Sequence, residues 1–187
     1  MMYHIENRTG LPDTMQTLLG DYPREAWPDH PNFARSIQNW MGAHQMFRQL
    51  AEITQSDTES FLNKNMNQQD YTGRLAHFGN QLVRNLHGHH SWEDRSFFPE
   101  LGAAENSLEH GLMMLEGDHV ELDRVLDSFT RGANRVIKLA DLDPTQMPEE
   151  AARMHDHSTA IGRFLARHLA DEEDLVVPII LHHKLRG

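Results

Sequence analysis

Two stretches of the sequence repeat one arrangement of histidine, acid and proline, and this repeat limits the fold more than any other feature. The stretch HHSWEDRSFFP begins at His89, and the stretch HLADEEDLVVP begins at His168. In each, a glutamate (Glu93 or Glu172) stands four residues after the first histidine, and a proline stands ten residues after it. Residues four apart lie on the same side of an α-helix. The repeat therefore predicts two helices that each present an imidazole and a carboxylate side by side.

Four long stretches have apolar residues spaced by three and four, which is the pattern of an amphipathic helix. We expect the helices to run from about 32 to a frayed end at Gln55–Asp57, from about 70 to 101, from Asn106 to the turn at Asp143-Pro144, and from there or from Pro148 to about 183. Asn106 and Glu109 fit a capping box at the start of the third helix. Pro99 and Pro178 should kink or stop the second and fourth helices.

Long amphipathic helices joined by modest connectors pack as an antiparallel bundle. The predicted fold class is therefore all-α, an antiparallel up-down four-helix bundle over residues 32–187 with an irregular N-terminal arm at residues 1–31. Four prolines and two glycines lie in the arm, where a short helix from Pro12 to Leu19, stopped by Gly20, also fits. We expect the arm either to cover one end of the bundle or to mediate a homodimer.

The first and third helices each carry one histidine in the middle of the apolar stripe, namely His44 and His119. The chain therefore consists of two predicted hairpins, each of the form His…His-x-x-x-Glu. Burying these ionisable side chains without partners would be costly, whereas two metal ions would give all of them a partner. The candidate metal ligands are His44, His89, Glu93, His119, His168 and Glu172. The alternative is a plain bundle with incidental histidines.

A second pair on the second helix, His90 and Asp94, is also four residues apart. Its counterpart on the fourth helix is Leu169 with Glu173, which lacks the histidine, so the repeat favours His89 and Glu93. We interpret His87, His90 and Asp94 as a solvated stripe, or as outer groups that orient the ligand imidazoles through hydrogen bonds. Glu173 is a candidate for the same orienting role.

Composition restricts the chemistry further. The 187 residues include 14 histidines and no cysteine, which excludes disulfides, thiolate zinc sites and iron–sulfur clusters. Histidine with carboxylate suits iron, manganese or zinc. A formal net charge of −11 argues against a nucleic-acid partner, which needs a basic surface. No apolar run approaches the ~18 residues of a membrane span, and the start lacks a signal peptide. We therefore expect a cytoplasmic protein without a membrane partner.

The order of ligand candidates (His, His-x-x-x-Glu, His, His-x-x-x-Glu) resembles that of the hemerythrin-like family, also called HHE cation-binding domains, over about residues 32–183. The resemblance implies a bundle around two iron ions joined by an oxo or hydroxo bridge, with manganese or zinc as alternatives. It assigns the ligand roles to the six candidates above, with Glu93 and Glu172 as the bridging carboxylates. The implied partner is a small diatomic or peroxide ligand.

One position departs from the pattern of the oxygen-carrying hemerythrins, which use two histidines four residues apart on the third helix. Here the residue four before His119 is Leu115. The missing histidine favours a more open centre that reacts with or senses dioxygen, peroxide or nitric oxide over a reversible oxygen carrier. The alternative function is iron homeostasis, in which the domain senses or stores iron and its folding depends on the metal.

Overall fold

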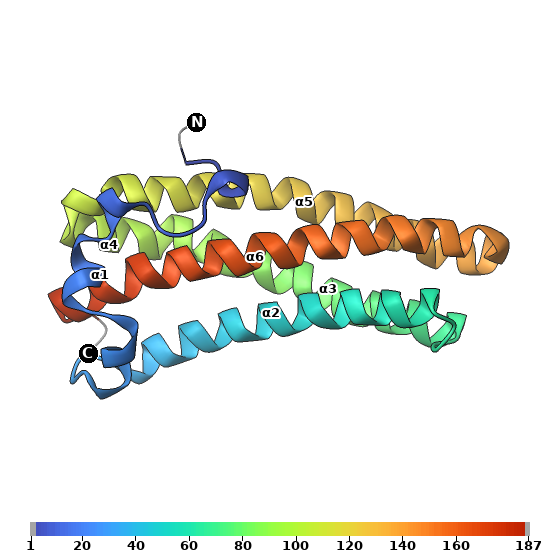
Figure 1. The fold of residues 1–187 in the computed structure, drawn as a ribbon, viewed down its shortest axis with the longest axis horizontal. Helices are drawn as coiled ribbons and strands as arrows, with labels where there is room; N and C mark the ends of the chain where they lie inside the picture. The colour runs from blue at the N-terminus through green and yellow to red at the C-terminus, as the bar shows by residue number, and fades with distance from the viewer. Residues whose placement is uncertain (1–2, 186–187) are drawn as a thin grey trace. The chain divides into compact units, whose positions relative to one another are not determined.

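The computed structural model describes residues 3–185, and four long helices in this part of the chain pack together (Figure 1). The four are α2 (Arg35–Leu62), α3 (Gln68–Trp92), α5 (Glu109–Leu142) and α6 (Met147–His183). The predicted all-α, hemerythrin-like four-helix bundle is confirmed. The third and fourth predicted helices begin and end close to the expected residues, whereas the first two differ in informative ways.

The first long helix continues past Gln55–Asp57, where the sequence predicted a frayed end. The carboxylate of Asp57 accepts hydrogen bonds from Nε and Nη2 of Arg74 at 2.8 and 3.0 Å. The hydroxyl of Thr58 donates to a backbone carbonyl one turn earlier and lies 3.1 Å from the hydroxyl of Tyr71. Polar residues that favour a helix end in isolation are thus held within α2 by partners on α3.

The second predicted helix is divided near Pro99. After α3 the backbone forms a π-helical segment, Glu93–Phe97, and then α4, Phe98–Ala104. The N–H of Phe98 donates to the carbonyl of Glu93, five residues back, and Pro99, which has no N–H, sits in the first turn of α4. Pro178 does not stop the fourth helix, because α6 runs through it to His183; the other predicted outcome, a kink at Pro178, stays a prediction.

The third helix does not open with the predicted capping box. A 3-10 turn, Asn106–Leu108, precedes α5, and the Asn106 amide donates to the carboxylate of Glu109 at 3.5 Å, side chain to side chain. The turn before α6 is capped as its sequence suggests, since the carboxylate of Asp143 accepts from the N–H of Thr145 at 3.2 Å.

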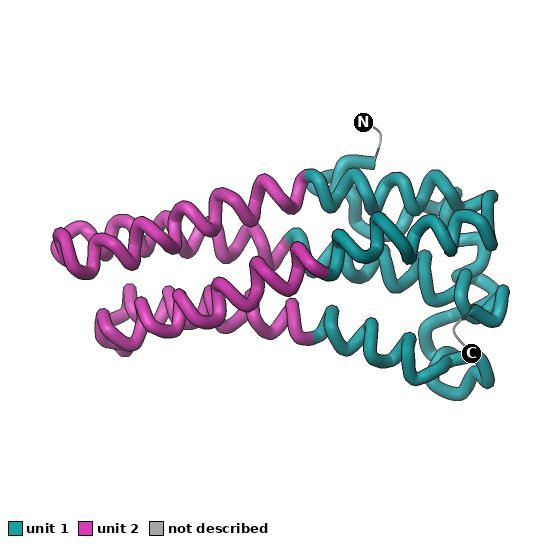
Figure 2. The backbone as a smooth tube through the Cα atoms, turned by 180° about the vertical axis from the view of Figure 1, so that it is seen from behind, with its two compact units in different colours: residues 1–45, 89–120, 164–187 teal, residues 46–88, 121–163 magenta. Residues whose placement is uncertain are grey.

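The chain divides into two compact units, drawn in different colours in Figure 2. Unit 1 comprises residues 1–45, 89–120 and 164–187, and unit 2 comprises residues 46–88 and 121–163. In unit 2, α5 and α6 approach closely at Gly132, where an added Cβ would lie 2.9 Å from the ring of His157 and 3.2 Å from the sulfur of Met154. A larger residue at position 132 would force these side chains to move.

The N-terminal arm is irregular, as predicted, and belongs to unit 1. It contains 3-10 turns at Ile5–Asn7, Asp13–Met15 and Arg24–Asp29, and the short helix α1 at Thr17–Asp21. The predicted short helix was placed too early, because Gly20 lies inside α1. Four apolar residues of the arm are buried in the hydrophobic core of unit 1, namely Leu11, Met15, Leu18 and Trp27. The division into an arm and a bundle domain at residue 31 stays a prediction.

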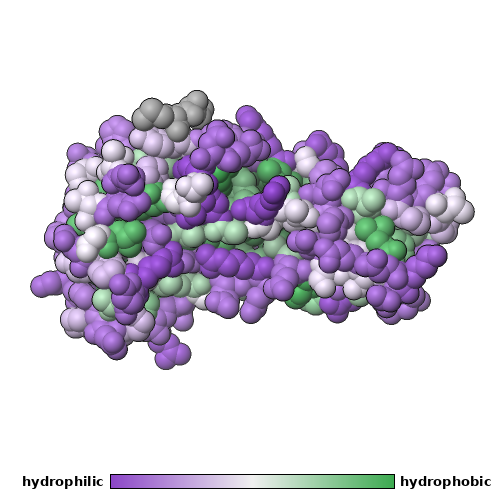
Figure 3. Space-filling view, in the orientation of Figure 1, coloured by the Kyte–Doolittle hydropathy of each residue, from purple (hydrophilic) through white to green (hydrophobic). Residues whose placement is uncertain are grey.

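Among the helices of residues 3–185, none has both the length and the apolar composition that crossing a bilayer requires. Hydrophilic residues cover much of the face shown in Figure 3.

Candidate metal centre

All six predicted ligands lie in unit 1, on five elements. His44 comes from α2, His89 from the end of α3, Glu93 from the start of the π-helical segment, His119 from α5, and His168 and Glu172 from α6. Except for His89, whose side chain is 10% exposed, each is buried. The structure brings the six together in two neighbouring groups and adds a seventh residue, His90.

The first group, here called the two-histidine group, consists of His44, His89, Glu93 and Glu172. One ligand atom from each lies within 4.8 Å of the others. Nε2 of His89 is 2.8 Å from Oε1 of Glu93 and 3.1 Å from Nε2 of His44. Nε2 of His44 is 3.4 Å from Oε2 of Glu172. This set of two imidazoles and two carboxylates suits a divalent metal ion.

The second group, here called the three-histidine group, consists of His90, His119 and His168, whose ligand nitrogens also lie within 4.8 Å of one another. The same two carboxylates face it. Oε2 of Glu93 is 3.8 Å from Nε2 of His119, and Oε2 of Glu172 is 3.8 Å from Nε2 of His168. Glu93 and Glu172 therefore lie between the groups, where a bridging carboxylate would have to be.

His90 is the residue that the sequence argument misplaced. It is 4% exposed rather than solvated, and its ring stacks on that of His119, with centroids 4.0 Å apart. Leu115, where the sequence departs from the oxygen-carrying pattern, is fully buried among apolar residues. Two sequence features together could have predicted that His90 joins the site: it directly follows His89, and Leu115 leaves the third helix one histidine short.

Buried polar atoms without hydrogen-bond partners test whether these residues fit metal ions. Within residues 3–185, such atoms include both ring nitrogens of His90, Nε2 of His119 and Nε2 of His168. They also include Oε2 of Glu93 and both carboxylate oxygens of Glu172. Buried polar atoms are ordinarily hydrogen-bonded, and leaving one unpaired costs about 1–3 kcal/mol. Because these orphan atoms gather in the two groups, the residues fit a pair of cations.

Three acidic residues outside the groups, here called the orienting carboxylates, contact the other ring nitrogen of a candidate ligand. Glu173 lies 3.0 Å from Nδ1 of His44, and Asp94 lies 2.7 Å from Nδ1 of His119. Asp118 lies 3.2 Å from Nδ1 of His168. Such contacts fix the tautomer that presents Nε2 to a metal. Glu173 and Asp94 were candidates from the sequence, whereas Asp118 was missed.

Burial controls the protonation of these groups. It lowers the pKa of His44 and His90, and it lowers the pKa of His168 to about 4, so the imidazoles are neutral and able to bind metal. Burial, together with the negative charge of Glu93, raises the pKa of Glu172. Burial also opposes ionisation of Glu93, but its interactions with His89, His119 and Trp40 together outweigh burial and lower its pKa. Close carboxylates of this kind favour a bound cation.

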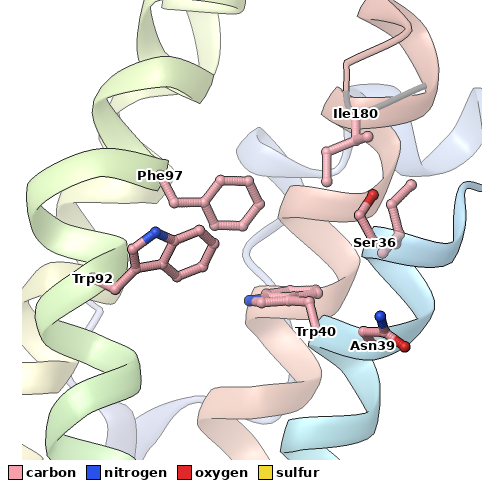
Figure 4. Close-up of a pocket in the computed structure, with 7 residues that line it drawn as sticks. Ser36, Asn39, Trp40, Trp92, Phe97 and Ile180 are labelled. Atoms are coloured by element: carbon pink, nitrogen blue, oxygen red, sulfur yellow. The ribbon is translucent and has the colours of Figure 1, made fainter.

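A cavity of about 300 Å³ lies next to Trp40 (Figure 4). Its lining includes Ser36, Asn39, Trp40, Trp92 and Phe97. Trp40 connects the cavity to the ligands, because its indole N–H donates to Oε1 of Glu93 at 2.7 Å and its ring lies 4.2 Å from that of His44. Trp92 is 41% exposed at the opposite wall.

These features define a four-helix bundle with a candidate metal site built from buried histidines and glutamates. The chain belongs to the hemerythrin family: residues 35–180 match the family described as the hemerythrin HHE cation binding domain. Comparisons with curated proteins and with solved structures gave no match.

Proposed function

We propose that the chain binds two iron ions, one at the two-histidine group and one at the three-histidine group, with Glu93 and Glu172 shared between them. The proposal rests mainly on one observation, the buried ligand atoms without hydrogen-bond partners on His90, Glu93, His119, His168 and Glu172. Bound cations would give these atoms partners, whereas an empty bundle would leave them buried at a cost. Orienting carboxylates behind three of the histidines support the same assignment.

Iron is the proposed metal because the ligands are imidazole and carboxylate and the sequence has no cysteine. Manganese and zinc suit similar ligands, so metal analysis decides among them. Iron at such a site would supply redox chemistry and a coordination position for a small oxidant. We propose dioxygen, peroxide or nitric oxide as that oxidant.

The two groups differ in a way that favours one position for the external ligand. With both carboxylates shared, the two-histidine group offers one imidazole fewer than the three-histidine group. The cavity next to Trp40 lies on the side of the two-histidine group. The aromatic walls favour a small neutral molecule over an ion, and the indole of Trp40 holds the Glu93 carboxylate in place beside it.

The test is to load the metal-free protein with ferrous iron without oxygen, measure bound metal, and then add dioxygen or nitric oxide. We expect about two irons per chain, as in other bundle di-iron sites, and new charge-transfer absorption on adding the oxidant. Glu93→Ala should abolish both results, whereas Glu121→Ala, at a half-exposed position in unit 2, should leave them unchanged. Failure of the wild-type protein to bind iron, or an unchanged spectrum, would reject the proposal.

A further inference from the structure

The N-terminal arm brings one arginine to the outer side of the three-histidine group. The Arg8 side chain is only 4% exposed. Its Nε donates to Asp171 at 3.0 Å, and both of its terminal nitrogens donate to the two carboxylate oxygens of Asp118. Asp118 is the orienting carboxylate of His168. A single side chain therefore stands between Arg8 and a candidate metal ligand.

A second arginine of the arm reaches the two-histidine group in the same manner. Arg24 donates from Nη1 to Glu173 at 2.9 Å and from Nε to Asp174 at 2.5 Å. Glu173 is the orienting carboxylate of His44. The guanidinium also lies over the ring of Trp27, 5.0 Å from its centroid, and Trp27 is buried in the core of unit 1. The arm is thus anchored by apolar packing next to the Arg24 contact.

The contacts of Arg8 with Asp118 and of Arg24 with Glu173 both fix the position of the accepting carboxylate. The planar guanidinium of Arg8 holds Asp118 through two parallel hydrogen bonds, which set the plane of the carboxylate as well as its position. Arg24 binds two neighbouring carboxylates of α6 at once. An orienting carboxylate that is free to rotate would let its imidazole turn away from the metal, and loss of such outer partners commonly costs about 10–100-fold in metal affinity.

We propose that Arg8 and Arg24 are positioning residues of the metal centre, and that each slows the release of the metal ion held by its own group. This inference rests on the proposed function. It extends the centre to residues outside the family match, which begins at residue 35. Arg8 acts through Asp118 on the three-histidine group, and Arg24 acts through Glu173 on the two-histidine group.

The experiment follows metal release from the full-length, iron-loaded protein into an excess of a chromogenic ferrous chelator, without oxygen. Arg8→Ala should release one metal ion about 10-fold faster and leave the release of the other unchanged. Arg24→Ala should instead speed up the release of the other metal ion, which is held by the two-histidine group. Arg8→Lys should fall between wild type and Arg8→Ala, because lysine keeps the charge but not the paired hydrogen bonds. The matched control is Arg74→Ala, which breaks an arginine–carboxylate pair in unit 2.

Two further measurements separate positioning from general stability. Thermal melting of the metal-free variants measures any cost to folding, and Arg8→Ala is repeated in an Asp118→Ala background. If Arg8 acts through Asp118, the second substitution removes the effect of Arg8→Ala on release. The proposal would be overturned if either variant released both metal ions equally faster, in proportion to its loss of stability. It would also be overturned if Arg8→Ala and Arg24→Ala folded and released metal at the wild-type rate. If Arg8→Ala does not fold, Arg8→Lys and Arg24→Ala decide by the same criteria.

The proposed function fails on different results. A wild-type protein that holds no iron, or His44→Ala and His168→Ala variants that hold as much as wild type, would reject the di-iron site and the arm's role with it. Loss of iron from these histidine variants together with unaffected arginine variants would reject only the role of the arm.

Discussion

The imidazole rings of His90 and His119 stack, with their centroids 4.0 Å apart and their planes 14° from parallel. The ring of His168 stands nearly perpendicular to that of His90, at 87°. This arrangement turns a nitrogen of each ring toward one small volume. A histidine from α3 thus joins His119 and His168, and the two candidate groups together contain five histidines. The more open centre expected from Leu115 stays a prediction.

Replacing His90 should therefore remove a ligand rather than a surface group. We expect His90→Ala to reduce bound iron from about two ions per chain toward about one, because the three-histidine group loses a donor. Elemental analysis after loading and desalting measures the change. His87→Ala is the control, because the His87 side chain is 68% exposed on the same helix. Full iron content in His90→Ala would show that His90 only packs against His119.

Trp40 is expected to influence the centre through its single hydrogen bond. Trp40→Phe keeps an aromatic ring but removes the buried donor to Glu93, at a cost of about 1 kcal/mol in protein stability. The affinity of the iron-loaded protein for nitric oxide should change several-fold, as measured by optical titration. Trp92→Phe alters the same cavity while the Trp40–Glu93 hydrogen bond stays in place, and it should have a smaller effect. Equal effects of the two substitutions would assign Trp40 to cavity shape alone.

Glu172→Gln should have opposite effects with and without metal. Glu172 is fully buried beside Glu93, and neither of its oxygens has a hydrogen-bond partner. Replacing an acid whose ionisation burial opposes should stabilise the metal-free protein by about 1 kcal/mol, or about 2–4 °C in melting temperature at this size. Saturating metal should raise the melting temperature less than in wild type, because the variant binds metal less tightly. Melting curves that match wild type in both states would contradict this account.

The metal-free protein should lose stability as the pH falls from about 6.5 toward 4. The pKa of His168 is lowered to about 4 by burial, against 6.5 for an exposed histidine. In this window the unfolded chain binds a proton that the folded chain does not, so stability decreases as the pH decreases. The effect of this group is of the order of 3 kcal/mol. Chemical denaturation at several pH values measures it, and His168→Gln should flatten the profile; an equally steep profile in that variant would assign the loss to other groups.

The helical repeat predicted much of this arrangement because periodicity is a local property. Residues four apart on a helix must lie on one side, so His89 with Glu93 and His168 with Glu172 followed from spacing alone, and the structure places all four in the two groups. Their role as metal ligands stays a prediction. Helix ends were harder to predict from the sequence, since Asp57 is kept inside α2 by Arg74, a partner 17 residues away.

The residues that were missed depend on packing between segments distant in sequence. His90 was set aside because the fourth helix has no equivalent, although adjacent helical residues differ by about 100° and both can face a site wide enough for two metal ions. Asp118 and Arg8 are 110 residues apart, and no spacing rule links an irregular arm to a helix. Such contacts come from three-dimensional packing, which a single sequence does not reveal.

All seven candidate ligands belong to unit 1, whereas unit 2 has polar contacts of its own, such as the hydroxyl pair of Thr58 and Tyr71. Residues 63–67, which connect α2 to α3, lie in unit 2 as well. An affinity label or a fluorescent reporter grafted into that connection would leave every donor atom of the centre chemically unaltered. This connection is therefore a natural attachment point for a probe of the proposed metal centre.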